Sequence, residues 1–255
     1  MKRVLLTALF YFFATVFSFS GLANTTPENE HNTYILVHGA TGGGWDWKGI
    51  DDRLTTNNHQ VYRPTLTGLG EKVHLANPEI NLTTHINDVV NLILFENLNN
   101  VVLVGHSYGG MVITGVMDRI PERIAYVIFL DAVVPDDGMS ANDVFGSSFP
   151  DEMIIDGQIH FPWLNAEQTY PKDVPQSLKT FTEPVSFNNP KALALPATYV
   201  AFVSPKDIEL RKSRDSSWKR AKERGWKIVT LDSDHNAQRT HPEELVSLLQ
   251  TTVKF

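Results

Sequence analysis

The stretch VVLVGHSYGGMVITGV, residues 101–116, decides the fold that we expect for this chain. Its first four residues are continuously apolar, which is typical of a strand buried on both faces of a parallel sheet. The pattern Gly-x-Ser-x-Gly follows at once, and a helical pattern then extends to Arg119. A serine between such a strand and such a helix indicates a nucleophile elbow, a sharp turn that exposes Ser107.

Small residues surround this serine, as the turn requires. Gly105, Gly109 and Gly110 let the strand and the helix approach each other around a strained serine backbone. The N-terminus of the following helix directs free N–H groups and the positive end of the helix dipole at Ser107, which favours an oxyanion there. We therefore predict that Ser107 is a catalytic nucleophile.

Apolar runs that alternate with helical patterns extend on both sides of this stretch. Strands that alternate with helices imply βαβ units. The fold class is therefore α/β, with a mostly parallel sheet and helices on both of its faces. The expected strands are residues 34–37, 60–63, 101–105, 124–130, 198–203 and 226–231, and the expected helices are residues 45–55, 84–98, 108–119, 211–224 and 242–253.

Residues 137–195 interrupt this alternation. They are rich in Pro, Asp, Asn and Ser, yet they also hold large aromatic side chains such as Phe149, Phe161, Trp163 and Phe181. A connection of this length inside a domain is usually either functional or disordered, and the aromatic content favours order. We expect a small helical cap over the strand ends, and an ordinary surface insertion is the alternative.

The N-terminus differs from the rest of the chain. Lys2 and Arg3 precede an apolar run of residues 4–20, and small residues stand at positions 21 and 23. This pattern predicts a signal peptide, residues 1–23, and a single exported domain, residues 24–255, in the periplasm or outside the cell. Without the signal segment we expect no stable membrane insertion, and an uncleaved N-terminal anchor is the alternative.

Composition narrows the partners. The formal net charge of −7 and the lack of clustered Lys and Arg in the sequence argue against nucleic acid as a partner. The chain has no cysteine, which excludes disulfides and thiolate catalysis. No His-Glu-x-x-His or comparable ligand spacing occurs. We therefore expect no metal and no other cofactor, and a small molecule as the substrate.

A second motif, HGATGGGW at residues 38–45, follows the first predicted strand. An oxyanion hole needs one amide from the residue after the nucleophile and one from a loop that leaves an earlier strand. Tyr108 supplies the first backbone N–H, and we predict that Ala40 supplies the second.

A serine hydroxyl needs a general base, because it is a poor nucleophile at neutral pH. Of the nine histidines, His235 lies on a loop after the last predicted strand and completes the order serine, acid, histidine. His38 and His106 lie inside the other two motifs, where we expect them to orient loops. His235 is therefore the predicted base.

The acid that supports His235 has two candidates on sequence grounds. It must reach the second ring nitrogen of the base from the end of a neighbouring strand. Asp131 ends the strand at residues 124–130, and Asp207 follows the strand at residues 198–203.

Together these motifs resemble the α/β-hydrolase fold, and within it the plant methylesterase and hydroxynitrile lyase group with its bacterial esterase relatives. The resemblance lies in LVHGA at residues 36–40, GHSYGG at 105–110, FLDA at 129–132 and DHN at 234–236. It implies a six-stranded core, because the first two strands of larger relatives are missing from this group.

The resemblance also favours one of the two candidate acids, Asp131 and Asp207, over the other. In the plant enzymes the acid lies one or two residues after the strand that matches residues 198–203, where this chain has Ser204 and Pro205. Asp207 comes later than that place. In the bacterial relatives the aspartate at the end of the preceding strand takes over, so the resemblance favours Asp131.

The same comparison favours one reaction. The lyases of this group carry a lysine just after the catalytic histidine, and this chain has Asn236 there. The resemblance therefore implies hydrolysis of small carboxylic esters through a Ser-His-Asp triad and an acyl-enzyme. The alternatives are a hydroxynitrile lyase-like enzyme and a non-catalytic ligand-binding homologue.

Overall fold

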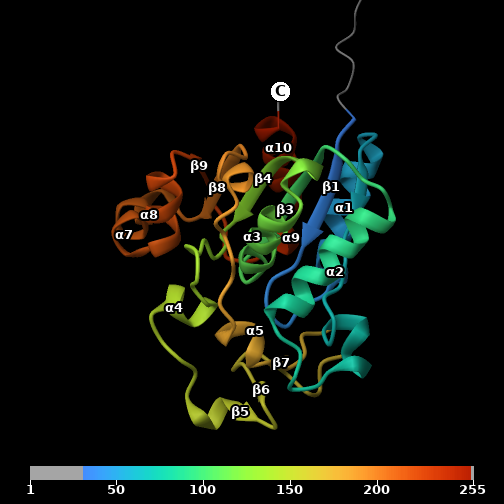
Figure 1. Ribbon diagram of the computed structural model, residues 1–255, viewed down its shortest axis with the longest axis vertical. Coiled ribbons are helices and arrows are strands. Elements are labelled where there is room, and N and C mark those ends of the chain that lie inside the picture. The colour runs from blue at the N-terminus through green and yellow to red at the C-terminus, as the bar shows by residue number, and fades with distance from the viewer. Residues whose placement is uncertain (1–30, 254–255) are drawn as a thin grey trace, which may run out of the picture. The chain divides into compact units, whose positions relative to one another are not determined.

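The six predicted strands pair into one parallel sheet in the computed structural model, which describes residues 31–253 (Figure 1). The order is β2-β1-β3-β4-β8-β9, and every neighbouring pair is parallel. The predicted signal peptide, residues 1–23, lies outside the described residues. The strands are β1 Thr33–Val37, β2 Gln60–Tyr62, β3 Val101–His106, β4 Ile124–Leu130, β8 Ala197–Phe202 and β9 Lys227–Leu231.

Helices cover both faces of the sheet, as expected for an α/β fold. Apolar side chains of α1, α9 and α10 pack on one face, and those of α2, α3 and α8 pack on the other. Successive side chains of each strand point to opposite faces of the sheet, where they pack against these helices. Leu36 on one face and Ile35 on the other are examples, and both are fully buried. The helices are α1 Lys48–Thr56, α2 Leu82–Phe95, α3 Gly109–Arg119, α7 Ile208–Arg214, α8 Ser216–Glu223, α9 Ala237–Thr240 and α10 Pro242–Thr252.

One predicted helix is two helices. The sequence pattern over residues 211–224 suggested a single helix, whereas the structure breaks it at Asp215, between α7 and α8. The Asp215 carboxylate accepts hydrogen bonds from the amides of Ser217 and Trp218 and so caps α8. Local capping thus overrides the helical pattern.

The insertion at residues 137–195 lies at the carboxyl ends of the strands, toward which the arrowhead of β1 points in Figure 1. It contains short helices, as predicted, and also a three-stranded antiparallel sheet that was not predicted. Strands of two residues are too short to show a periodicity. The cap elements are α4 Ala141–Phe145, β5 Ile154–Ile155, β6 Gln158–Ile159, β7 Gln176–Ser177, α5 Lys179–Thr182 and α6 Pro190–Leu193.

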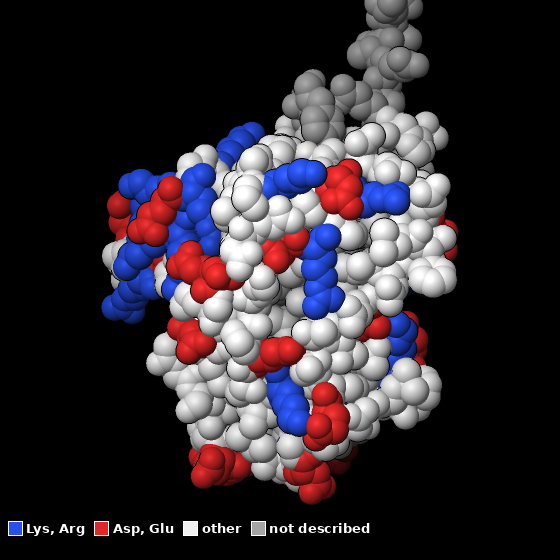
Figure 2. All heavy atoms as spheres, in the orientation of Figure 1, with Lys and Arg blue, Asp and Glu red and all other residues white. Residues whose placement is uncertain are grey.

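Basic side chains gather over α7 and α8, at the upper left of Figure 2. The expectation that the chain lacks clustered Lys and Arg was therefore wrong, because the net charge of the whole chain averages over this cluster. Nearby carboxylates neutralise much of it: Lys212 pairs with Glu209 at 2.7 Å, and Arg220 and Arg224 both pair with Asp136. Within residues 31–253, no helix is long and apolar enough to cross a membrane.

Candidate active site

Ser107 stands on the sharp turn between β3 and α3 that the sequence predicted. Its φ of 53° lies in the left-handed region, which is strained for a residue with a side chain. Its amide donates to the Leu130 carbonyl at 3.2 Å, and its carbonyl accepts from Val133 at 3.0 Å. A Cβ atom on Gly110 would lie 2.0 Å from the Val133 carbonyl oxygen, so only glycine fits beside this turn.

His235 meets Ser107 across the carboxyl edge of the sheet. It lies on the loop after β9, and its Nε2 atom is 3.0 Å from Ser107 Oγ. The side chain of His235 is 49% exposed. This geometry lets Nε2 accept the serine proton.

Asp131, the first residue after β4, supplies the carboxylate that His235 contacts. Its Oδ2 atom lies 2.5 Å from His235 Nδ1, and only 4% of its side chain is exposed. Asp207, the other sequence candidate, is exposed and lies in a turn before α7. Among the described residues, its carboxylate has no hydrogen bond or ion pair, so the structure brings Asp131 and not Asp207 to His235.

Arg211 is a member of the site that sequence reasoning missed. Its Nη2 atom lies 2.5 Å from Asp131 Oδ1, and its Nε atom lies 2.8 Å from Asp215. The amide of Phe202 also donates to Asp131 Oδ1, at 3.2 Å. One oxygen of Asp131 thus faces His235 and the other faces two donors. No motif marks Arg211, because its role depends on how α7 packs against the sheet.

These contacts keep Asp131 ionised. Burial acts to raise the pKa of its carboxyl, but the hydrogen bond from His235 and the charge of Arg211 outweigh burial. The pKa of Asp131 therefore lies below its ordinary value. An ionised carboxylate accepts the Nδ1 proton of His235, which leaves Nε2 free to act as a base.

His106 contacts His235 through its ring and through a hydrogen bond to the backbone. Its ring lies 4.7 Å from the His235 ring, between centroids, and its Nε2 atom donates to the His235 carbonyl at 2.7 Å. A carbonyl only accepts, so the proton of the neutral ring is on Nε2. Burial and the nearby His235 lower the pKa of His106 to about 4, so it stays neutral at neutral pH. As predicted for a motif histidine, it orients a loop.

Two backbone amides beside the cavity have no partner within residues 31–253. The Ala40 and Tyr108 N–H groups donate to no described residue, and both residues line the cavity that contains Ser107. Gly39 makes the close approach possible, because a Cβ atom there would lie 3.1 Å from Ser107 Cβ and 3.0 Å from a ring atom of His106. The loop thus lies where an oxyanion hole needs it.

The comparisons with known proteins identify the family of the chain. The model of the alpha/beta hydrolase family matches residues 34–248. The chain belongs to this family. It is 46% identical over 120 residues to the carbendazim hydrolyzing esterase of Nocardioides sp. (strain SG-4G), which covers 47% of this chain and 50% of the relative. It is also 32% identical over 132 residues to methylesterase 1 of Arabidopsis thaliana, and this match covers 50% of this chain and 50% of the relative. The matches thus span about half the length of these relatives.

Solved structures share the fold of this α/β-hydrolase. An extracellular α/β-hydrolase from a Paenibacillus species superposes with a TM-score of 0.67, covering 86% of this chain and 98% of its own, at 22% identity. The resemblance to esterase-type members of the family and the α/β fold class, with its six-stranded parallel sheet, are therefore confirmed.

The cavity of this α/β-hydrolase lies between the serine and the cap. Its volume of about 870 Å³ suits a small organic molecule. Aromatic side chains of the cap form one wall, and polar groups near His235 form the other. Within the described part of the chain, no group of three or more His, Asp or Glu residues is arranged to hold a metal ion. The aromatic wall consists of Phe145, Phe149, Phe161, Trp163 and Phe181.

Proposed function

We propose that this chain is a serine hydrolase that cleaves small carboxylic esters through Ser107, His235 and Asp131. The continuous hydrogen-bond path from Ser107 Oγ through the His235 ring to Asp131 Oδ2 carries the proposal. A nucleophile, a base and an acid that orients the base are the three parts that acyl transfer needs. The esterases among the relatives support the same class of reaction.

In the first half of the proposed reaction, His235 Nε2 takes the proton of Ser107 as Oγ attacks the ester carbonyl carbon. The carbonyl π bond opens, and its electron pair becomes the oxyanion that the amides of Ala40 and Tyr108 hold. The tetrahedral intermediate then collapses, and its bond to the alcohol oxygen breaks. The alcohol leaves with the proton from His235, and the acyl group stays on Ser107.

Water completes the proposed cycle by the same steps. His235 removes a proton from water as the oxygen attacks the acyl carbon, and the second tetrahedral intermediate expels Ser107 Oγ. The proton returns to the serine, and the carboxylic acid leaves. Asp131 stays ionised throughout, because it stabilises the imidazolium and does not accept a proton itself.

The cavity favours a substrate with an aromatic or other apolar group. The side chains of Phe161 and Phe181 are buried within the cap and line the cavity that contains Ser107. The names of two relatives, a carbendazim hydrolyzing esterase and a plant methylesterase, indicate ester hydrolysis, and the second name indicates methyl esters. We therefore propose methyl and short alkyl esters of aromatic acids as the first substrates to test.

The test uses the protein purified without residues 1–23. We expect it to hydrolyse p-nitrophenyl acetate and methyl benzoate, and to be labelled by a fluorophosphonate at Ser107, as located by peptide mass spectrometry. The Ser107→Ala variant is the control and loses both signals. A folded wild-type protein that is not labelled contradicts the proposal, because a non-catalytic homologue lacks an activated serine. Cleavage of mandelonitrile without ester hydrolysis identifies a lyase instead.

We also propose that the protein is exported, which rests on residues 1–23 alone. Expression of the full chain in a bacterium, followed by cell fractionation and N-terminal sequencing, tests this. A mature protein outside the cytoplasm that begins at Asn24 is the expected result. An intact N-terminus in the membrane fraction identifies an anchor, and an intact cytoplasmic protein contradicts export.

A further inference from the structure

The cap forms hydrogen bonds with the oxyanion loop at Thr41, which directly follows Ala40. The amide of Thr41 donates to Gln176 Oε1 at 2.9 Å, and its carbonyl accepts from the amide of Val174 at 2.9 Å. Its hydroxyl lies 3.0 Å from Asp173 Oδ1 and accepts from Trp163 Nε1 at 3.1 Å. Backbone and side chain of Thr41 are therefore both held by the cap.

Thr41 needs such support because of its backbone conformation. Its φ of 64° lies in the left-handed region, where a β-branched residue is a conformational outlier. A residue in this region persists only when the surrounding structure holds it there. Relaxation of Thr41 toward negative φ would rotate the peptide that joins it to Ala40. The Ala40 N–H belongs to the preceding peptide, so this rotation would reach it through the Ala40 Cα atom and displace it within the cavity that contains Ser107.

Gln176 also decides which amide is free for the substrate. Because its Oε1 atom accepts the Thr41 N–H, that N–H is already used within the protein, while the neighbouring Ala40 N–H has no partner among the described residues. An oxyanion hole works through donors that are fixed in advance and left unpaired. The cap thus leaves one amide of the loop free and engages the next.

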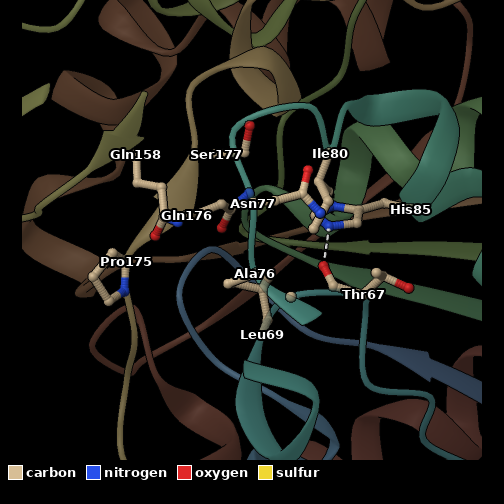
Figure 3. A pocket seen from close by; sticks show the side chains of 11 residues that line it. Thr67, Leu69, Ala76, Asn77, Ile80, His85, Gln158, Pro175, Gln176 and Ser177 are labelled. Atoms are coloured by element: carbon tan, nitrogen blue, oxygen red, sulfur yellow. Dashed lines mark hydrogen bonds between the residues drawn. The ribbon is translucent and has the colours of Figure 1, made fainter. Parts of the chain in front are cut away.

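The position of Gln176 is itself fixed. Its side chain is 1% exposed, and its Nε2 atom donates to Thr180 at 2.8 Å. Behind it, Figure 3 shows Gln176 and Ser177 of the cap facing His85 across a pocket of only about 10 Å³. Little room remains for another rotamer of Gln176, so its oxygen is a rigid acceptor.

We propose that Gln176 is a positioning residue of the reaction: through Thr41 it holds the Ala40 amide in the oxyanion hole. The cap is then part of the catalytic apparatus as well as a wall of the cavity. The inference rests on the proposed ester hydrolysis. It differs from a purely structural role, because it assigns the effect of Gln176 to the transition state and not to substrate binding.

The test compares Gln176→Met with the control Ser177→Ala in the purified protein without residues 1–23. Gln176→Met keeps a side chain of similar shape and removes the acceptor of the Thr41 amide. Ser177 is the other residue of β7, and its buried hydroxyl donates to the Pro78 carbonyl, so the control removes a buried hydrogen bond of the cap that does not involve Thr41. For Gln176→Met we expect kcat on p-nitrophenyl acetate to fall by about 10- to 100-fold, because small misplacements of reacting groups have effects of this size. KM should change less than about threefold, and Ser177→Ala should keep kcat within about threefold.

A second measurement tests whether Gln176 positions the Ala40 amide or only contributes to the packing of the cap. Phenylboronic acid forms a tetrahedral anionic adduct on an active serine, and its Ki should rise in Gln176→Met by the same factor as kcat falls. If Gln176→Met does not fold, Trp163→Phe decides, because it removes one donor to Thr41 at a side chain that is 56% exposed. Its kcat should fall, and the Ki of phenylboronic acid should rise, by a common factor of about three or more.

Three outcomes overturn the inference. They are a folded Gln176→Met variant with unchanged kcat, a change in KM alone, and equal losses in Gln176→Met and Ser177→Ala. The proposed function fails separately, since wild-type protein without ester hydrolysis or Ser107 labelling would contradict it before any variant is compared.

Discussion

Replacement of Asp131 by Asn tests the triad most sharply, because the two oxygens of Asp131 have different surroundings. Oδ1 accepts from the amide of Phe202 and from Arg211, and Oδ2 accepts from His235 Nδ1. An asparagine has only one oxygen, and two donors hold it on the Oδ1 side. Its NH₂ group then faces His235 Nδ1, which must become the acceptor. The imidazole proton moves to Nε2, where it prevents removal of the serine proton.

The expected loss follows from this wrong tautomer. In known triads the corresponding change lowers kcat by about 10⁴, or about 5.5 kcal/mol of transition-state stabilisation at about 1.36 kcal/mol per tenfold. Asn is also one of the residues that tolerates the φ of 45° found at position 131, so the backbone should not change.

The assay measures kcat with p-nitrophenyl acetate for Asp131→Asn and for the control Asp207→Asn. The control removes the same charge at an exposed position that does not contact His235, and it should retain wild-type kcat. Circular dichroism and the thermal midpoint should match the wild type in both variants. A folded Asp131→Asn protein with kcat within tenfold of wild type, together with loss of activity in Asp207→Asn, would refute the reasoning.

Three further predictions concern stability. The folded pKa of Asp131 is lowered, so its ionisation stabilises the protein above the ordinary carboxyl pKa, and this stabilisation is lost as pH falls through the folded pKa. Arg211→Met removes the positive charge beside Asp131 and so raises the folded pKa of Asp131. The pH at the midpoint of acid unfolding, followed by circular dichroism, should therefore increase. An unchanged midpoint would contradict a stabilising Asp131–Arg211 pair. The pKa of His106 falls from 6.5 to about 4 on folding, so the free energy of unfolding should decrease as pH drops between these values, by up to about 3 kcal/mol. His106→Gln should reduce this pH dependence in urea titrations, and an equal dependence in the variant would count against the assignment. Gly110→Ala should destabilise the fold by about 1–3 kcal/mol, because the added Cβ atom would overlap a backbone oxygen. The control Gly49→Ala, in α1, should be neutral or stabilising. Equal thermal midpoints for the two variants would contradict the steric argument.

Local patterns in the sequence were sufficient for the main features of the fold. Buried parallel strands need continuous apolar runs, so the six strands could be located from composition and spacing alone. The elbow around Ser107 and the glycine-rich loop at residues 38–45 were visible for a similar reason, since a sharp turn or a close approach tolerates few residue types.

Contacts between distant segments decided the rest. On sequence grounds Asp131 and Asp207 both followed strands beside the base, and only the three-dimensional structure brought Asp131 to within 2.5 Å of His235 Nδ1. Arg211 and Gln176 had no motif, because their roles come from partners 80 and 135 residues away in the chain. The sequence by itself determined which residue types could do the chemistry. The family resemblance favoured Asp131, and tertiary packing determined which acid contacts the base and which cap residue contacts the glycine-rich loop, because hydrogen bonds depend on distances that no local pattern encodes.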